Sequence, residues 1–218
     1  MPFFTFLAED KTKVVYWKIE EEESFFLEKA TFLDQNEVRQ YSNAQNRIQW
    51  LAGKLLMHSF FGETTFKTIK KDDLGKPHSV KNDFFLSISH TDKLVGMVVS
   101  DKNVGIDIQK FNPKLLKIAS KFINEKDLNQ ISHSNLNIHE KILVQWSTKE
   151  ALFKAYGKGQ LDFRKNLILN WDHDFKHEGG KFEAIISKNN QNLHYEVLYC
   201  YIFEDYLMAI VTKSETLH

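Results

Sequence analysis

Apolar residues recur at helical spacing in two long stretches of the chain. From Ala44 to Phe61 they lie three and four positions apart, and Gly62 follows as a stop. A second such stretch covers residues 139–156, and glycines follow it. The stripes comprise Ile48, Leu51, Leu55, Leu56 and Phe60 in the first stretch, and Ile142, Leu143, Trp146 and Phe153 in the second. Asp34 with Glu37 three residues later predicts the start of a shorter helix.

Apolar runs bounded by turn residues predict strands in both halves of the chain. These runs cover residues 14–19, 84–89, 94–100, 104–109, 193–203 and 206–212. Residues 86–100 and 198–212 each show a strand, a short acidic turn and a strand, and each segment follows a helix that contains a tryptophan. This repeat predicts an α+β fold of two similar lobes, residues 1–103 and 104–218, each a small, mainly antiparallel sheet with a packed helix.

Composition narrows the classes of protein. The 218 residues suffice for one domain or two small ones, and the formal net charge of zero argues against a generally basic nucleic-acid binder. No apolar run reaches the ~20 residues that a membrane-spanning helix needs, and the N-terminus lacks a signal-peptide pattern. We therefore expect a cytoplasmic protein. The single cysteine, Cys200, excludes an internal disulfide and is expected to be a buried, reduced thiol.

Two short motifs carry candidate chemistry. In the strand of residues 104–109, alternation places Ile106 and Ile108 on one face and Asp107 and Gln109 on the other. Alone, this pattern is more typical of an edge strand with a solvated aspartate. Residues 146–154 (WSTKEALFK) place Trp146, Glu150 and Lys154 on one helix face, where a Glu–Lys pair is a common surface feature worth only ~0.3–0.5 kcal/mol.

Taken together, the two motifs predict a site for a metal ion and a phosphate group. Asp107 and Glu150 offer the hard carboxylate oxygens that Mg²⁺ binds together with substrate phosphates. Lys154, one helical turn from Glu150, is placed to neutralise charge on a transferring phosphoryl group.

These residues resemble the signatures of the two-lobed, surfactin-synthetase-activating type of 4′-phosphopantetheinyl transferase. The helix motif of residues 146–154 matches the W-x-x-K-E-[AS]-x-x-K signature at every fixed position, and GIDIQ at 105–109 is similar to the G-[IV]-D-[IVL]-E strand. Weaker similarities lie, in order, in LGKP (74–77), LSISHT (86–91), FINEKDL (122–128) and AYGKG (155–159). The resemblance covers roughly residues 45–165.

The resemblance implies the reaction. Coenzyme A would bind between the lobes, and its phosphopantetheine would pass to a serine of an apo acyl or peptidyl carrier protein, releasing adenosine 3′,5′-bisphosphate. It implies Mg²⁺ held by Asp107, Gln109 and Glu150. Glu150 would also serve as base for the serine, directly or through water, and Lys154 would stabilise the leaving group. Family members carry an acid where this chain has Gln109, so metal affinity is expected to be lower. A monomer is expected, without nucleic-acid or membrane partners.

The resemblance also implies contacts to coenzyme A outside the metal. Arg47 and His90 would contact its 3′-phosphate, Lys76 a phosphate or the adenine, and Ser89 would assist. Three of them have structural alternatives: Arg47 as a solvent-facing helix residue, Lys76 as a turn residue and His90 as a strand-end histidine. Lys149 is either near the phosphates or solvated. Trp146 is expected to pack the helix against the sheet.

Other interpretations of the sequence stay open. The chain could be a non-catalytic protein that binds carrier proteins or coenzyme A through a weakened metal site, or an unrelated Mg²⁺-nucleotide phosphotransferase that would act on ATP. The His- and Asp-rich residues 171–178 are expected to form a solvated loop rather than a metal site. The basic residues 67–71 are either a solvated surface or a docking point for an acidic carrier protein.

Overall fold

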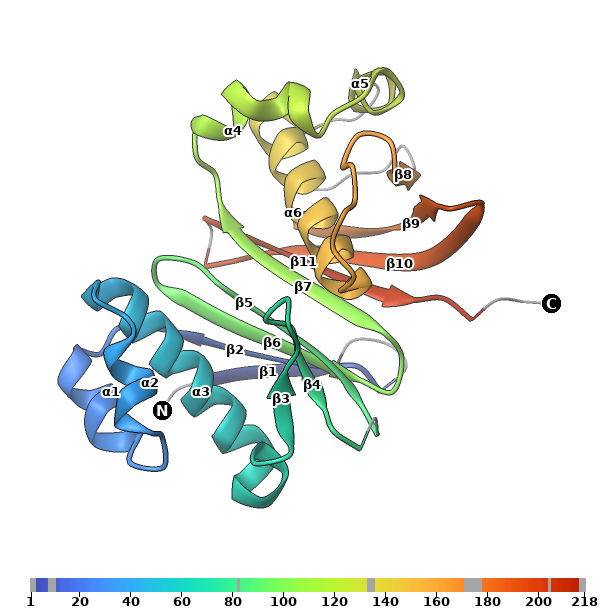
Figure 1. Cartoon of the computed structure of the whole chain (residues 1–218). Coiled ribbons are helices and arrows are strands. Elements are labelled where there is room, and N and C mark those ends of the chain that lie inside the picture. Colours follow the sequence, from blue (N-terminus) through green and yellow to red (C-terminus); the bar gives the residue numbers. More distant parts are fainter. Residues whose placement is uncertain are drawn as a thin grey trace. The chain divides into compact units, whose positions relative to one another are not determined.

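The computed structural model describes residues 3–7, 11–81, 83–132, 136–170, 178–203 and 205–215. The chain separates into two compact units, residues 1–101 and 102–218, each with its own sheet and long helix (Figure 1). Strands and helices in each unit agree with the α+β class expected from the sequence. No helix in these described ranges is long and apolar enough to span a bilayer.

Unit 1 (residues 1–101) is built on an antiparallel sheet of four strands. Their order is β1 (Phe3–Leu7), β2 (Lys13–Lys18), β6 (Leu94–Ser100) and β5 (Phe85–His90). The long helix α3 (Ala44–Phe66) packs on β2, β5 and β6 (Figure 1). The remaining elements are the helices α1 (Glu23–Lys29) and α2 (Gln35–Arg39) and a small pair of strands, β3 (Ile69–Lys71) and β4 (Pro77–Ser79).

Helix ends in unit 1 follow their capping residues. The Asp34 carboxylate accepts a hydrogen bond from the Asn36 amide at 2.8 Å, so the predicted start of α2 is confirmed. Gly62 does leave helical geometry, at φ 71° and ψ 165°, but a further helical turn continues to Phe66. The glycine therefore kinks α3 where the sequence predicted that it would end the helix.

Unit 2 (residues 102–218) is built on an antiparallel sheet of five strands. Their order is β7 (Val104–Lys110), β11 (Tyr206–Lys213), β10 (Gln191–Ile202), β9 (Gly179–Lys188) and β8 (Leu167–Asn170), so β7 is an edge strand. The helix α6 (Ile138–Tyr156) packs chiefly on β7 and β11. Before it come α4 (Lys114–Ile118), a 3₁₀ turn (Ala119–Lys121) and α5 (Glu125–Ser132).

Helix α6 has well-defined ends and an unusually polar buried surface. Asn137 and Glu140 form a capping box, and Gly157 ends the helix in the left-handed conformation at φ 64°, as predicted. Its buried residues include Gln145, Ser147 and Thr148. Ile142 and Leu143 of the predicted stripe are buried, whereas Trp146 and Phe153 are half-buried, and Trp146 still packs against the core. The helix is covered on several sides, so apolar spacing alone does not identify its packed face.

Several smaller expectations can be placed on this fold. The two segments with the same layout form the hairpins β5–β6 and β10–β11. Cys200 is a free thiol, as expected, but it is half-buried, and burial raises its pKa. Residues 171–177, which hold most of the His- and Asp-rich segment, lie outside the described residues.

Candidate functional site

The close approach of β7 to α6 creates the first candidate site. A β-carbon at Gly105 would lie 2.0 Å from the carbonyl oxygen of Ala151, far inside contact distance. Only glycine therefore lets the strand lie this close to the helix. Alternation along β7 then directs Asp107 toward α6, where the residue is 7% exposed. The strand is at the sheet edge, but its aspartate is buried and not solvated.

Asp107 forms an ion pair with Lys154 of α6. The Lys154 Nζ lies 2.8 Å from the Asp107 Oδ1. The lysine side chain keeps 29% of its surface exposed, whereas the aspartate keeps 10%. A partly exposed ammonium group thus contacts a largely buried carboxylate. Lys154 is therefore not simply one partner of a Glu–Lys pair on the helix surface, because its ion pair joins α6 to β7.

Glu150 completes the charged group. Burial raises the pKa of its carboxyl, the negative charge of Asp107 raises it further, and Lys154 lowers it. Glu150 and Asp107 therefore lie within electrostatic reach of each other, although they come from different elements. Gln109, half-buried, follows Asp107 on the same face of β7.

These donors fit a hard cation. Two desolvated carboxylates that repel each other, with a carboxamide oxygen nearby, form a donor set of the kind that Mg²⁺ takes. Among the described residues, no three His, Cys, Asp or Glu side chains gather around one point. A cation here would consequently rest on Asp107, Glu150 and the uncharged Gln109.

A cavity of about 580 Å³ opens beside Glu150. Its wall comes from three segments of unit 2: residues 118–122, one face of α6 and the loop of residues 160–164. Trp146 lines this cavity, with its ring centroid 5.0 Å from that of Phe122 and 6.0 Å from that of Phe163. Trp146 also packs against the core that α6 shares with the sheet, as expected, and its ring partners belong to the cavity wall.

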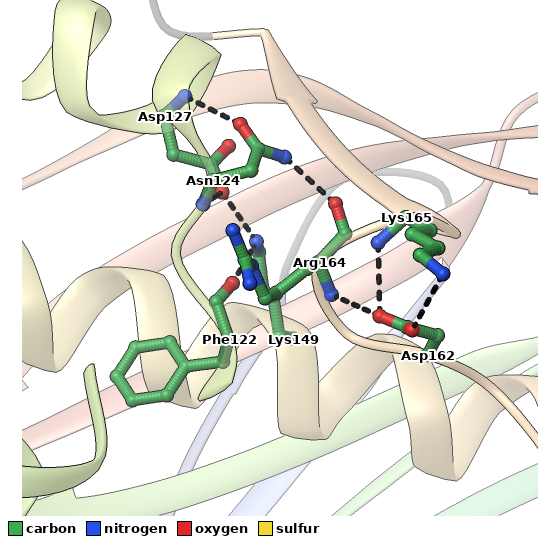
Figure 2. A network of polar contacts seen from close by, with 7 residues as sticks. All are labelled: Phe122, Asn124, Asp127, Lys149, Asp162, Arg164 and Lys165. Carbon is green, nitrogen blue, oxygen red and sulfur yellow. Dashed lines mark hydrogen bonds and ion pairs between the residues drawn. The ribbon is translucent and has the colours of Figure 1, made fainter. Parts of the chain in front are cut away.

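Lys149 is buried and not solvated. Its side chain is 0% exposed, and its Nζ donates to the Phe122 carbonyl oxygen and to the Asp127 Oδ2, each at 2.6 Å (Figure 2). Burial lowers its pKa, and the Asp127 charge opposes that effect. The expectation that Lys149 is solvated is therefore wrong, and its closeness to the substrate phosphates stays a prediction. The neighbouring lysines of the motif have separate roles: Lys154 faces β7, and Lys149 faces the segment before α5.

In unit 1, His90 lines a second cavity, of about 260 Å³. Its wall includes Trp50 and Lys54 of α3 and Lys71 of β3. His90 is exposed, while Ser89, the preceding residue of β5, is 2% exposed and points to the opposite face of the sheet. The structure thus separates two residues that the sequence grouped together.

Lys54 is a charged residue of this cavity that the sequence analysis did not single out. Its Nζ lies 5.3 Å from the centre of the Trp50 ring and 3.7 Å from the Glu37 Oε2. Burial lowers its pKa, Glu37 raises it, and Lys71 lowers it again. An adjoining cavity of about 560 Å³ is lined by Lys67, Lys70 and Lys71. Lys67, Lys70 and Lys71 are exposed, as expected of a solvated surface, and they also line this cavity.

Arg47 and Lys76 lie in local networks of unit 1. The Arg47 guanidinium forms an ion pair with Glu23 and donates to the Tyr41 carbonyl oxygen. Asp72 holds the turn around Lys76, whose backbone amide donates to the Asp72 Oδ1 at 2.9 Å. Burial lowers the Lys76 pKa, and Asp72 raises it. Roles for Arg47, Lys76 and Ser89 toward a ligand stay predictions.

Comparison with known proteins points to one family. Residues 103–211 match the 4′-phosphopantetheinyl transferase superfamily. The chain is 30% identical over 125 residues to the 4′-phosphopantetheinyl transferase gsp of Aneurinibacillus migulanus, covering 55% of this chain and 52% of that protein. It is 29% identical over 89 residues to the 4′-phosphopantetheinyl transferase of Bacillus subtilis, covering 40% of each chain. The similarity thus spans about half the length, or less, of these curated relatives.

Proposed function

Because the chain belongs to the 4′-phosphopantetheinyl transferase superfamily, we propose that it transfers 4′-phosphopantetheine from coenzyme A to a serine of an apo acyl or peptidyl carrier protein. The observation that carries the proposal is the meeting of Asp107, Glu150 and Lys154 between β7 and α6. The region matched by the family contains all three residues.

The reaction replaces the phosphoanhydride bond of coenzyme A by a phosphate ester of the carrier serine. The serine oxygen forms a bond to the phosphorus next to the pantetheine arm, the pyrophosphate P–O bond breaks, and adenosine 3′,5′-bisphosphate leaves. Glu150, beside the 580 Å³ cavity, is the carboxylate proposed to accept the serine proton. Lys154, partly exposed, is proposed to stabilise the negative charge on the leaving phosphate. Such reactions depend mainly on positioning and charge stabilisation.

Asp107, Gln109 and Glu150 are the residues that would hold Mg²⁺. When bound, the ion would neutralise charge on the pyrophosphate. Burial of Asp107 favours this role, since a desolvated carboxylate needs a counter-charge. In the structure Lys154 supplies that counter-charge.

One experiment tests the activity directly. The purified protein is mixed with coenzyme A, Mg²⁺ and several apo carrier proteins, and the carriers are weighed by intact mass spectrometry with a chelator control. A metal-dependent gain of one phosphopantetheine is expected. No gain on any carrier, from protein that still binds coenzyme A, would favour a non-catalytic binding protein. Turnover of ATP in its place would favour a nucleotide phosphotransferase.

Gln109 gives a prediction about the metal. The Gln109→Glu variant adds a third negative charge to the donor set, so half-maximal transfer should need roughly 3- to 10-fold less Mg²⁺, from the greater charge count of the ligands. Initial rates over a Mg²⁺ titration measure this. Gln191→Glu, at an exposed position of β10, is the matched control and should leave the titration unchanged. Unchanged Mg²⁺ dependence in Gln109→Glu would remove residue 109 from the donor set.

The unit 1 cavity gives a prediction about coenzyme A. We propose that Lys54, Lys71 and His90 bind an anionic part of this substrate, because two amines and an imidazole face one aromatic-walled cavity. Lys54→Ala should raise the KM for coenzyme A about 10-fold, the loss of one charge-assisted contact, with little change in kcat. Lys81→Ala, exposed in the same unit, is the control. An unchanged KM would exclude Lys54 as a ligand contact.

A further inference from the structure

The buried pair of Lys149 and Asp127 connects the segments that form the Glu150 cavity. Three segments line that cavity: residues 118–122, α6 and the loop of residues 160–164. Lys149 lies on α6 directly before Glu150, and Asp127 is in the first turn of α5. Their 2.6 Å contact therefore joins the helix that carries Glu150 to the segment beside it.

The contacts continue from this pair to the third segment. Asn124 and Asp127 hold each other: the Asp127 amide donates to the Asn124 Oδ1 at 2.8 Å, and the Asn124 amide donates to the Asp127 Oδ2 at 3.1 Å. The Asn124 Nδ2 then donates to the Arg164 carbonyl oxygen at 2.8 Å. Within the loop, the Asp162 carboxylate accepts from the amides of Arg164 and Lys165 (Figure 2). One continuous network thus reaches all three walls.

We propose that Lys149 and Asp127 are positioning residues, whose buried ion pair fixes the Glu150 turn of α6 against the cavity wall formed by residues 118–122 and 160–164. This inference rests on the proposed transferase function for its effect on turnover. Its predicted effect on the order of the loop of residues 160–164 is independent of that function.

The chemistry of the pair suits positioning better than substrate binding. The Lys149 side chain has no exposed surface, and two acceptors already hold its Nζ. A phosphate could bind the Nζ only if these contacts were broken and the side chain became exposed. A buried ion pair is also directional, since each charge must face its partner at short range, whereas apolar packing tolerates small rotations and shifts. The network therefore restricts how α6 lies against its neighbours in a way that Phe122 and Trp146 alone would not.

The test removes the pair without leaving a buried charge. In Lys149→Met/Asp127→Leu, both partners become apolar residues of similar size, a replacement that buried ion pairs often tolerate. We expect a folded protein with near wild-type thermal stability, a kcat at least 10-fold lower, and KM values for coenzyme A and carrier within about 2-fold, as loss of positioning predicts. Lys126→Met, exposed on α5, is the matched control and should behave as wild type.

A milder variant covers the case in which the double variant does not fold. Asn124→Ser retains a side chain that can cap α5 but is too short to reach the Arg164 carbonyl. Hydrogen exchange of residues 162–166 should be faster than in wild type, and kcat should fall by a smaller factor than in the double variant. The exchange measurement needs no substrate, so it is informative even if wild-type protein modifies no carrier, the result that would refute the transferase.

Two results would overturn the positioning role. The first is wild-type kcat and wild-type loop exchange in a folded double variant or in Asn124→Ser. The second is a double variant with an unchanged kcat and a KM for coenzyme A raised 10-fold, while Asn124→Ser keeps the wild-type KM. That result would place Lys149 in contact with the substrate.

Discussion

The variants Glu150→Gln and Asp107→Asn should each lose transfer activity by about 100- to 1,000-fold, the usual cost of removing one charged group that stabilises a reaction of this type. Glu150→Gln removes the proton acceptor and one of the two carboxylates, while its size is unchanged. Asp107→Asn keeps a side chain that can contact Lys154 but removes the charge that its ammonium now faces at 2.8 Å. Initial rates of carrier modification, followed by intact mass at saturating coenzyme A, measure both effects.

The matched control for this pair is Glu196→Gln, an exposed position of β10 away from α6, and it should keep the wild-type rate. Thermal unfolding of all three variants separates loss of function from loss of fold. Near wild-type transfer by both Glu150→Gln and Asp107→Asn would remove the proposed roles of these carboxylates, whatever the family of the chain.

Local sequence signals predicted most of the elements that carry this site. Strand alternation at Ile106, Asp107 and Ile108 identified which side chain turns away from the apolar face, since a strand offers only two faces. Capping residues located helix ends at Asp34 and Gly157, whereas Gly62 kinks α3 and does not end it. These signals act over a few residues, so no knowledge of the rest of the chain was needed.

Long-range contacts could not be predicted in this way. The helical spacing of residues 146–154 gives the angle between Lys149 and Lys154 around the helix axis, but not which neighbour each of them meets. That depends on Asp127 and Asp107, which lie 22 and 47 positions away in sequence. The sequence therefore did not find the buried partner that explains Lys149, and its ranking of Lys154 above Lys149 as a site residue stays a prediction.

Polar residues in packed surfaces were a second source of error. Gln145, Ser147 and Thr148 are fully buried on α6, although their polarity suggests a solvated face. Lys54 and Trp50 likewise line a cavity whose other wall, at His90 and Lys71, comes from distant segments. A hydrophobic pattern alone cannot distinguish a helix face that meets solvent from one that meets a polar cavity or a closely packed strand.

Gly105→Ala should be the most damaging single substitution for the fold of unit 2. The added β-carbon would meet the Ala151 carbonyl oxygen at 2.0 Å and the Ala155 backbone nitrogen at 2.9 Å, and neither backbone atom can turn aside as a flexible side chain does. We expect the free energy of unfolding to fall by about 3 kcal/mol or more, at the upper end of overpacking effects. Urea unfolding followed by circular dichroism measures this change.

The control is Gly53→Ala in α3, where the nearest atom to the new β-carbon is the Cδ1 of Ile88 at 3.2 Å, the end of a flexible side chain. There the helix preference of alanine, worth up to about 1 kcal/mol over glycine, should offset the contact. If Gly105→Ala does fold, β7 must have moved away from α6, and Asp107 with it, so transfer should be lost along with stability. Wild-type stability and activity in Gly105→Ala would show that β7 and α6 do not pack as closely as the site requires.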